Sequence, residues 1–260
     1  MPGSEVWRGI WLKVERAKDH VHDLDLRVAE FMRRKPYAVD VSREQVTGQH
    51  VISALVTEQP PLWWGVIAAD AVQNLRSALD LTIYQLVLAS GAKPRPGTGF
   101  PIAETAEEYQ DLSPRALSGL SLEMQELVHR LRPYRNGNPA LWRLQRLDDA
   151  CRQVGIQPVT AVTKSLIDVF SNLDFPNTPI TISPGYPYKA VYPIESGTEL
   201  ARVARAHTPS QLNVNAQGAF FVAFGQPQVI QGEPLLATLR ALVRATESTV
   251  QPLLRPLIAG

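Results

Sequence analysis

The segment from residue 62 to residue 90, LWWGVIAADAVQNLRSALDLTIYQLVLAS, constrains the fold of this chain more than any other. On a helix that advances about 100° per residue, its apolar side chains fall on one arc and its polar side chains on the opposite one. The apolar arc consists of Ala71, Val72, Leu75, Ala78, Leu79, Thr82, Ile83 and Leu86. Proline precedes the segment and Gly91 follows it, as is usual at helix ends. The pattern predicts a long helix with one face in a core.

The polar arc of the same helix holds most of the candidate site. Arg76 and Asp80 are four residues apart and can form an ion pair, and Asp70 and Asn74 have the same spacing. If the arc faces water, this is a solvated surface with a weak ion pair. If it faces a cleft, these are buried polar groups that need partners. Both interpretations remain open from the sequence.

The segment from Asp70 to Leu81 resembles the helix signature of an uncharacterised family of bacterial and phage proteins, approximately Gly-Asp-x-x-His-Asn-Leu-Arg-Ser-Ala-Leu-Asp-His. This chain agrees with it at Asp70 and from Asn74 to Asp80, whereas Gln73 and Leu81 stand where the family has His. The spacing of the family's Arg and second His is similar to that of HEPN ribonucleases, in which these side chains act together on RNA; this is a distant analogy. Because leucine cannot transfer protons, the resemblance implies that this chemistry is lost here.

A second signature of the family, approximately Pro-Leu-Trp-x-Leu-x-x-Leu-Asp-Asn-x-Asp-Lys-His-Arg, resembles residues 139–154. Asp148 is retained, Arg152 replaces Lys, and Gln153 replaces the His. All three histidines of the two signatures are therefore absent, which favours a degenerate site between residues 70–84 and 142–153. The candidate ligand-binding residues are Asp70, Asn74, Arg76, Asp80, Tyr84, Asp148 and Arg152. We predict no catalytic residue, no metal ligand and no cofactor.

Residues 5–35 show four heptads of apolar positions, in which Trp7, Val14, Val21 and Val28 alternate with Ile10, Ala17, Leu24 and Phe31. One interpretation is a helix packed along the central one in a bundle. The other is a homodimer seam through residues 7–31. The bundle is favoured, because the pattern stops after four heptads and Trp7 is bulky for a dimer core.

The other elements follow from their periodicity and their turn residues. We expect a β-hairpin over residues 37–41 and 50–57, short helices within residues 104–132, and a helix beginning at Pro139. Ser113, Ser121 and Asn138 are the expected helix caps, Leu122 is expected to point inward, and Cys151 reads as a core residue. The later strands are predicted at residues 159–162, 180–183, 190–193, 200–206 and 219–224. A last helix over residues 234–258 is expected to break at Pro252 and Pro256.

These elements predict an α+β fold, with a helical bundle packed beside a mostly antiparallel β-sheet. We expect a mainly helical region with an N-terminal β-hairpin over residues 1–157. A β-rich region over residues 158–260 then ends in a helix that packs back on the bundle. Together they are expected to form one compact domain.

The composition limits the function. A net charge of +1 argues against a protein-wide nucleic-acid footprint. A local basic patch, which either is solvated or contacts anions or nucleic acid, is formed by Arg130, Arg132, Arg135, Arg143, Arg146 and Arg152. A single cysteine and the lack of any apolar run near 18 residues predict a cytoplasmic protein with no membrane partner.

Three functions remain open. The first is a non-catalytic ligand-binding or regulatory protein, whose partner is an unknown small molecule, nucleotide or RNA. The second is a hydrolase that acts on RNA or a nucleotide through a site centred on Arg76, which requires Arg76 and Arg152 to converge in one pocket. In the third, residues 70–84 form only a structural polar network, and Arg76→Ala would lower stability without affecting any ligand.

Overall fold

The computed structural model describes residues 3–162, 180–181, 193–203 and 220–258. Within them the fold is α+β, as predicted, with antiparallel strand pairing throughout. The chain divides into two compact units: a helical unit of residues 1–24, 65–156 and 236–260, and a sheet unit of residues 25–64 and 157–235. The β-hairpin therefore groups with the β-rich half of the chain. The sequence-based boundary at residue 157 stays a prediction.

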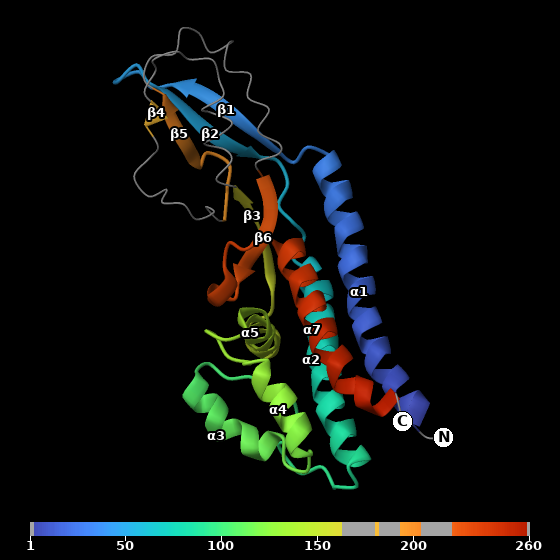
Figure 1. Ribbon diagram of the computed structural model, residues 1–260. Coiled ribbons are helices and arrows are strands. Elements are labelled where there is room, and N and C mark those ends of the chain that lie inside the picture. The colour runs from blue at the N-terminus through green and yellow to red at the C-terminus, as the bar shows by residue number, and fades with distance from the viewer. Residues whose placement is uncertain (1–2, 163–179, 182–192, 204–219, 259–260) are drawn as a thin grey trace. The chain divides into compact units, whose positions relative to one another are not determined.

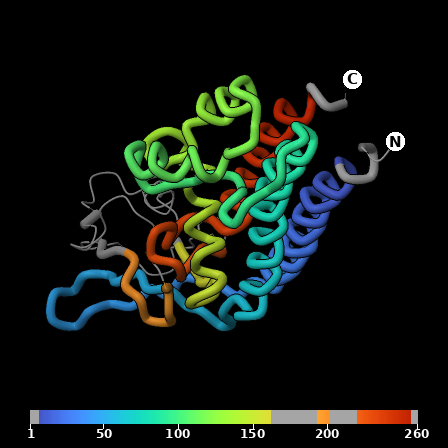
Figure 2. Tube along the Cα trace, turned by 90° about the horizontal axis from the view of Figure 1, so that it is seen from below, coloured from blue at the N-terminus to red at the C-terminus, as the bar shows by residue number. Residues whose placement is uncertain are grey.

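The helical unit is built on α2 (Trp64–Ala89), which lies side by side with α1 (Gly3–Arg33) and α7 (Leu235–Ile258) (Figures 1 and 2). An ion pair between Lys18 and Glu247 joins α1 to α7. Every residue of the predicted apolar arc of α2, from Ala71 to Leu86, is buried. The amphipathic pattern was therefore sufficient to predict which face of α2 enters the core.

The heptad positions of α1 are largely buried inside the single chain. Ile10, Val14, Ala17 and Leu24 are at most 1% exposed, as the bundle interpretation requires. Side chains already buried in one chain are not available to form a seam with a second copy. A homodimer through residues 7–31 stays a prediction, and it would have to use the outer face of α1, where Leu12 and Leu26 are each 57% exposed.

Three shorter helices complete the helical unit: α3 (Ala106–Ala116), α4 (Leu122–Arg130) and α5 (Pro139–Gln153). The predicted caps of α4 and α5 are confirmed. The Ser121 hydroxyl accepts a hydrogen bond from the Met124 amide at 3.3 Å, and Asn138 Oδ1 accepts one from the Leu141 amide at 3.2 Å. These side chains satisfy amide groups that have no partner in the first turn of a helix.

Three predictions about helix ends were wrong. Ser113-Pro114 does not begin a helix, because α3 already begins after Thr105, which caps the Glu108 amide, and Pro114 lies in its last turn. Leu122 is 83% exposed rather than inward, since it is the first residue of a short helix. Finally, α7 spans Leu235–Ile258, close to the predicted range of residues 234–258, but neither Pro252 nor Pro256 breaks it.

The sheet unit contains a four-stranded antiparallel sheet in the order β1-β2-β5-β4. Its strands are β1 (Tyr37–Arg43), β2 (His50–Val56), β5 (Glu199–Val203) and β4 (Ile180–Thr181). A separate pair is formed by β3 (Gln157–Val162) and β6 (Phe220–Gln226), and the short 3₁₀ helix η3 (Gln228–Ile230) follows β6. The predicted hairpin is confirmed as β1 and β2. Most of the strand predicted at residues 190–193 lies outside the described residues.

Candidate functional site: a polar pocket between α2 and α5

The polar arc of α2 faces a pocket of about 510 Å³ within the helical unit. Side chains from α2, from α5 and from the loop between α2 and α3 line it. The lining residues are Gln73, Arg76, Ser77, Asp80, Leu81, Tyr84, Thr98, Asp148 and Arg152. A cavity of this size with mixed polar and apolar walls is typical of small-molecule sites. Of the two interpretations of the arc, the structure supports the cleft.

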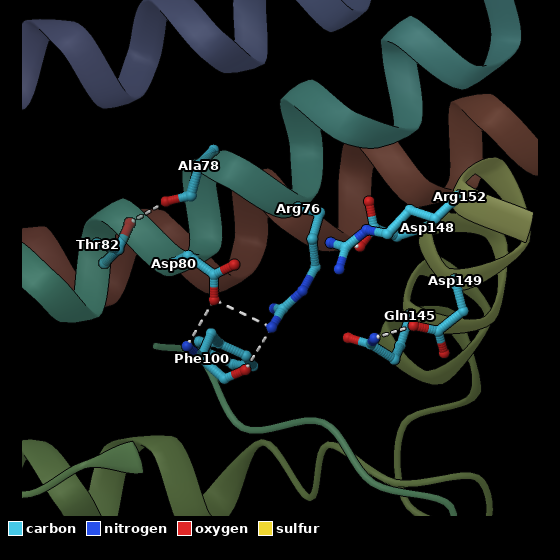
Figure 3. Close-up of polar contacts among 9 residues, drawn as sticks. All are labelled: Arg76, Ala78, Asp80, Thr82, Phe100, Gln145, Asp148, Asp149 and Arg152. Carbon is cyan, nitrogen blue, oxygen red and sulfur yellow. Dashed lines mark hydrogen bonds and ion pairs between the residues drawn. The ribbon is translucent and has the colours of Figure 1, made fainter. Parts of the chain in front are cut away.

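Arg76 and Asp80 line the pocket and bind the backbone of the same loop residue, Phe100 (Figure 3). Arg76 Nη2 donates to the Phe100 carbonyl at 2.9 Å and lies 3.0 Å from Asp80 Oδ1. The same Asp80 oxygen accepts a hydrogen bond from the Phe100 amide at 2.9 Å. The Arg76 side chain is only 14% exposed, and its Nη1 atom has no hydrogen-bond partner among the described residues. This pair therefore fixes the loop against α2.

The loop is held from its other side by α3. The Arg115 guanidinium donates to the Pro96 carbonyl from Nε at 3.2 Å and from Nη2 at 3.1 Å. Thr98 accepts a hydrogen bond from the Arg95 amide at 2.9 Å, which closes a tight turn and places Thr98 at the pocket. The wall formed by this loop is thus anchored to two helices.

The opposite wall belongs to α5 and contains a second ion pair, between Asp148 and Arg152. The Asp148 side chain is 3% exposed, whereas that of Arg152 is 67% exposed. Burial raises the pKa of the Asp148 carboxyl, although Arg152 and then Arg76 oppose this shift. Figure 3 shows the guanidinium groups of Arg76 and Arg152 extending toward the same space from α2 and α5.

The structure brings together five of the seven candidate residues: Arg76, Asp80, Tyr84, Asp148 and Arg152 all line the pocket. Asp70 and Asn74 do not line it. The Asn74 amide instead donates to the Asp70 carbonyl at 2.8 Å, one turn back in the same helix. The Asn74 side chain is therefore bound to the backbone of its own helix and does not reach the pocket.

Four lining residues were missing from the predicted site: Gln73, Ser77, Leu81 and Thr98. Gln73 lies three residues before Arg76, Ser77 three residues before Asp80, and Leu81 four residues after Ser77, so all three belong to the same stripe of α2. Thr98 had no comparable signal, because its place depends on the fold of the loop.

The remaining chemistry-bearing groups lie elsewhere. Cys151 is partly buried beside the site, and burial raises the pKa of its thiol to about 12, which disfavours the nucleophilic thiolate. Among the described residues no group of three or more His, Cys, Asp or Glu side chains is placed to hold a metal ion. None of the helices in the described ranges is long and apolar enough to cross a membrane.

The expected basic patch is largely neutralised. Arg130 pairs with Glu126 at 2.7 Å, Arg135 with Glu104 at 3.2 Å, and Arg146 with Asp149 at 2.8 Å. Arg132 donates to the Tyr134 hydroxyl at 2.9 Å. These contacts favour the solvated-face interpretation over a nucleic-acid surface.

In comparisons with known proteins, no family model, no curated protein and no solved structure matches the chain.

Proposed function

We propose that this protein is a non-catalytic binding protein, whose pocket between α2 and α5 holds a small polar molecule. The observation behind the proposal is the pocket itself, a cavity of about 510 Å³ with polar groups converging from two helices and an anchored loop. Anchored walls lower the entropy cost of binding, since less of the site has to be ordered by the ligand. A cytoplasmic location is part of this proposal.

The proposal includes the resemblance to the family with the Asn-Leu-Arg-Ser-Ala-Leu-Asp-His signature. Gln73 and Leu81, two of the three positions at which that family has His, line the pocket. Gln153, the third, is exposed and does not line it. A glutamine and a leucine in those places leave a site that can bind but lacks the imidazole groups for proton transfer.

A pocket-filling substitution tests this proposal. In Leu81→Trp the larger side chain would occupy the cavity, while Leu88→Trp places the same side chain two turns later on α2, at a position that is 45% exposed and outside the pocket. Native mass spectrometry of freshly purified protein should show a bound small molecule in the wild type and in Leu88→Trp but not in Leu81→Trp. The released molecule should be chemically unchanged after incubation with the protein.

A hydrolase that acts on RNA or a nucleotide is the second candidate, and one observation favours it. Arg76 and Arg152 line the same pocket, with the buried carboxyl of Asp148 beside them. Against it, each guanidinium is already paired with a carboxylate, so little positive charge is left to stabilise a phosphoryl group.

Cleavage of a single-stranded RNA oligonucleotide distinguishes the two candidates. Arg152→Gln removes the exposed guanidinium of the pocket. Arg130→Gln is the control: it removes an exposed arginine on α4 that also pairs with an acidic residue four positions earlier. Turnover that is lost in Arg152→Gln and kept in Arg130→Gln would establish the hydrolase and overturn the binding proposal.

A further inference from the structure

The charge balance of the pocket limits the kind of molecule it can hold. Two of its lining residues are arginines and two are aspartates, and they form two ion pairs, Arg76 with Asp80 and Arg152 with Asp148. The other lining side chains are neutral. Because the charges in the site are paired, neither an anion nor a cation is strongly attracted to it. The lining therefore favours a ligand without net charge.

The hydrogen-bonding groups of the pocket are both donors and acceptors. Asp80 uses Oδ1 for two contacts, while its Oδ2 has no hydrogen bond within the described parts of the chain, and the side chain is 42% exposed. Ser77, Thr98 and Tyr84 contribute hydroxyl groups, which both donate and accept. Arg152 adds N–H groups beyond the one that faces Asp148. A ligand whose own groups donate and accept suits this wall, and a hydroxyl does both.

The main apolar groups of the lining lie on α2. Leu81 and Tyr84 lie three residues apart on α2, and Tyr84 is 42% exposed. An aromatic ring with a hydroxyl offers an apolar face and a polar edge to the same ligand. A saturated ring with hydroxyl groups around its rim matches this arrangement, because its C–H face can lie on Tyr84 while the rim meets the polar groups.

We propose that the pocket binds a neutral, hydroxyl-rich ring, of the class of monosaccharides and cyclic polyols. Asp80 accepts hydrogen bonds from ligand hydroxyls, Arg152 donates to ligand oxygens, and Tyr84 covers one ring face. This inference rests on the proposed binding function and names its ligand class. The Arg76–Asp80 pair keeps the loop wall in place through Phe100, so the site needs no large rearrangement to accept the ring.

Ligand-observed NMR tests the inference with D-ribose, D-glucose and myo-inositol as neutral probes and with inorganic phosphate as the anionic probe. We expect at least one neutral probe to bind, with an affinity that Tyr84→Ala weakens about tenfold. Leu81→Trp should abolish the binding, whereas Leu88→Trp should not. Raising NaCl from about 50 mM to about 300 mM should leave it unchanged, since screening affects only charged ligands.

The outcomes separate this inference from the proposed function. If phosphate alone binds, with salt sensitivity and loss in Leu81→Trp, the neutral-ligand inference is overturned and the pocket remains a binding site. Binding of a neutral probe that survives in Leu81→Trp places it outside the pocket and also overturns the inference. If no probe binds, the inference fails. If native mass spectrometry also finds no small molecule bound to the wild-type protein, the proposed binding function fails as well.

Discussion

Asp80 on α2 accepts a hydrogen bond from the backbone amide of Phe100, with 2.9 Å between Oδ1 and the nitrogen. The two residues are twenty positions apart, and the contact crosses from a helix to an irregular loop. Arg76 completes the arrangement by donating to the carbonyl of the same residue. One ion pair thus satisfies both backbone polar groups of Phe100 and helps to hold the loop wall of the pocket in place.

Asp80→Ala should lower the free energy of unfolding by about 1–2 kcal/mol, because it leaves the Phe100 amide without its acceptor and the Arg76 guanidinium without its ion-pair partner. Asp19→Ala is the control, since Asp19 is 69% exposed and lies 4.0 Å from Arg16 on the surface of α1. Its effect should stay within about 0.5 kcal/mol. Urea denaturation measures both. Equal effects of the two variants would show that the Phe100 contact contributes nothing.

Gly99→Ala tests the same clamp by crowding it. A β-carbon at residue 99 would lie 2.8 Å from Asp80 Oδ1, closer than such atoms approach, so the carboxylate would have to move away from Phe100. We expect a loss of about 1–2 kcal/mol. Gly9→Ala adds the same methyl group on α1, where nothing lies within 4 Å, and should stabilise the protein by up to about 1 kcal/mol. If Gly99→Ala left the free energy of unfolding unchanged, the loop or the Asp80 carboxylate could move at no cost.

Much of the helical unit could be predicted because its signals are local. The burial of α2 follows from its repeat of three and four residues, and Ser121 and Asn138 cap their helices through contacts three residues away. Leu122 shows where such reasoning fails. An apolar residue at the first position of a short helix has no preceding turn to hold it against the core, and it is exposed.

The candidate site was only partly predictable for a different reason. The stripe on α2 that contains Arg76 and Asp80 could be read from the sequence, but the extent of the pocket along it could not. Asp70 has suitable spacing and still does not line the pocket, whose lining on α2 begins at Gln73. Likewise, no local pattern indicates that Asp80 would bind the peptide of Phe100, since that contact depends on how the loop folds back.

Leu79→Ala and Leu122→Ala should differ sharply in stability, although both remove the same atoms. Leu79 on α2 is fully buried, so truncation leaves a cavity and should cost about 2–5 kcal/mol. Leu122 is 83% exposed, and its truncation should change the free energy of unfolding by less than about 0.5 kcal/mol. Thermal unfolding of the two variants beside the wild type checks this. A large effect of Leu122→Ala would restore the inward orientation expected from the sequence.

The buried carboxyl of Asp148 makes stability depend on pH. Burial raises its pKa in the folded chain above the ordinary value of 3.8, so the folded state binds the proton more tightly than the unfolded state. The stability gained from this group is fully present below pH 3.8 and is lost as pH rises through the higher folded-state pKa. Asp148→Asn removes the titration, so the stability of the wild type relative to this variant should fall as pH rises across that window.

Arg152→Gln provides a second measurement on the same group. Arg152 opposes the raised pKa of Asp148, and its removal should raise that pKa further. The decline in stability, measured by urea denaturation at a series of pH values, should then extend to higher pH than in the wild type. If the stability of the wild type relative to Asp148→Asn instead rises with pH, attraction to the two arginines outweighs burial. The wall formed by α5 would then present an ionised Asp148 carboxylate, because its attraction to the arginines would exceed the cost of burying its charge.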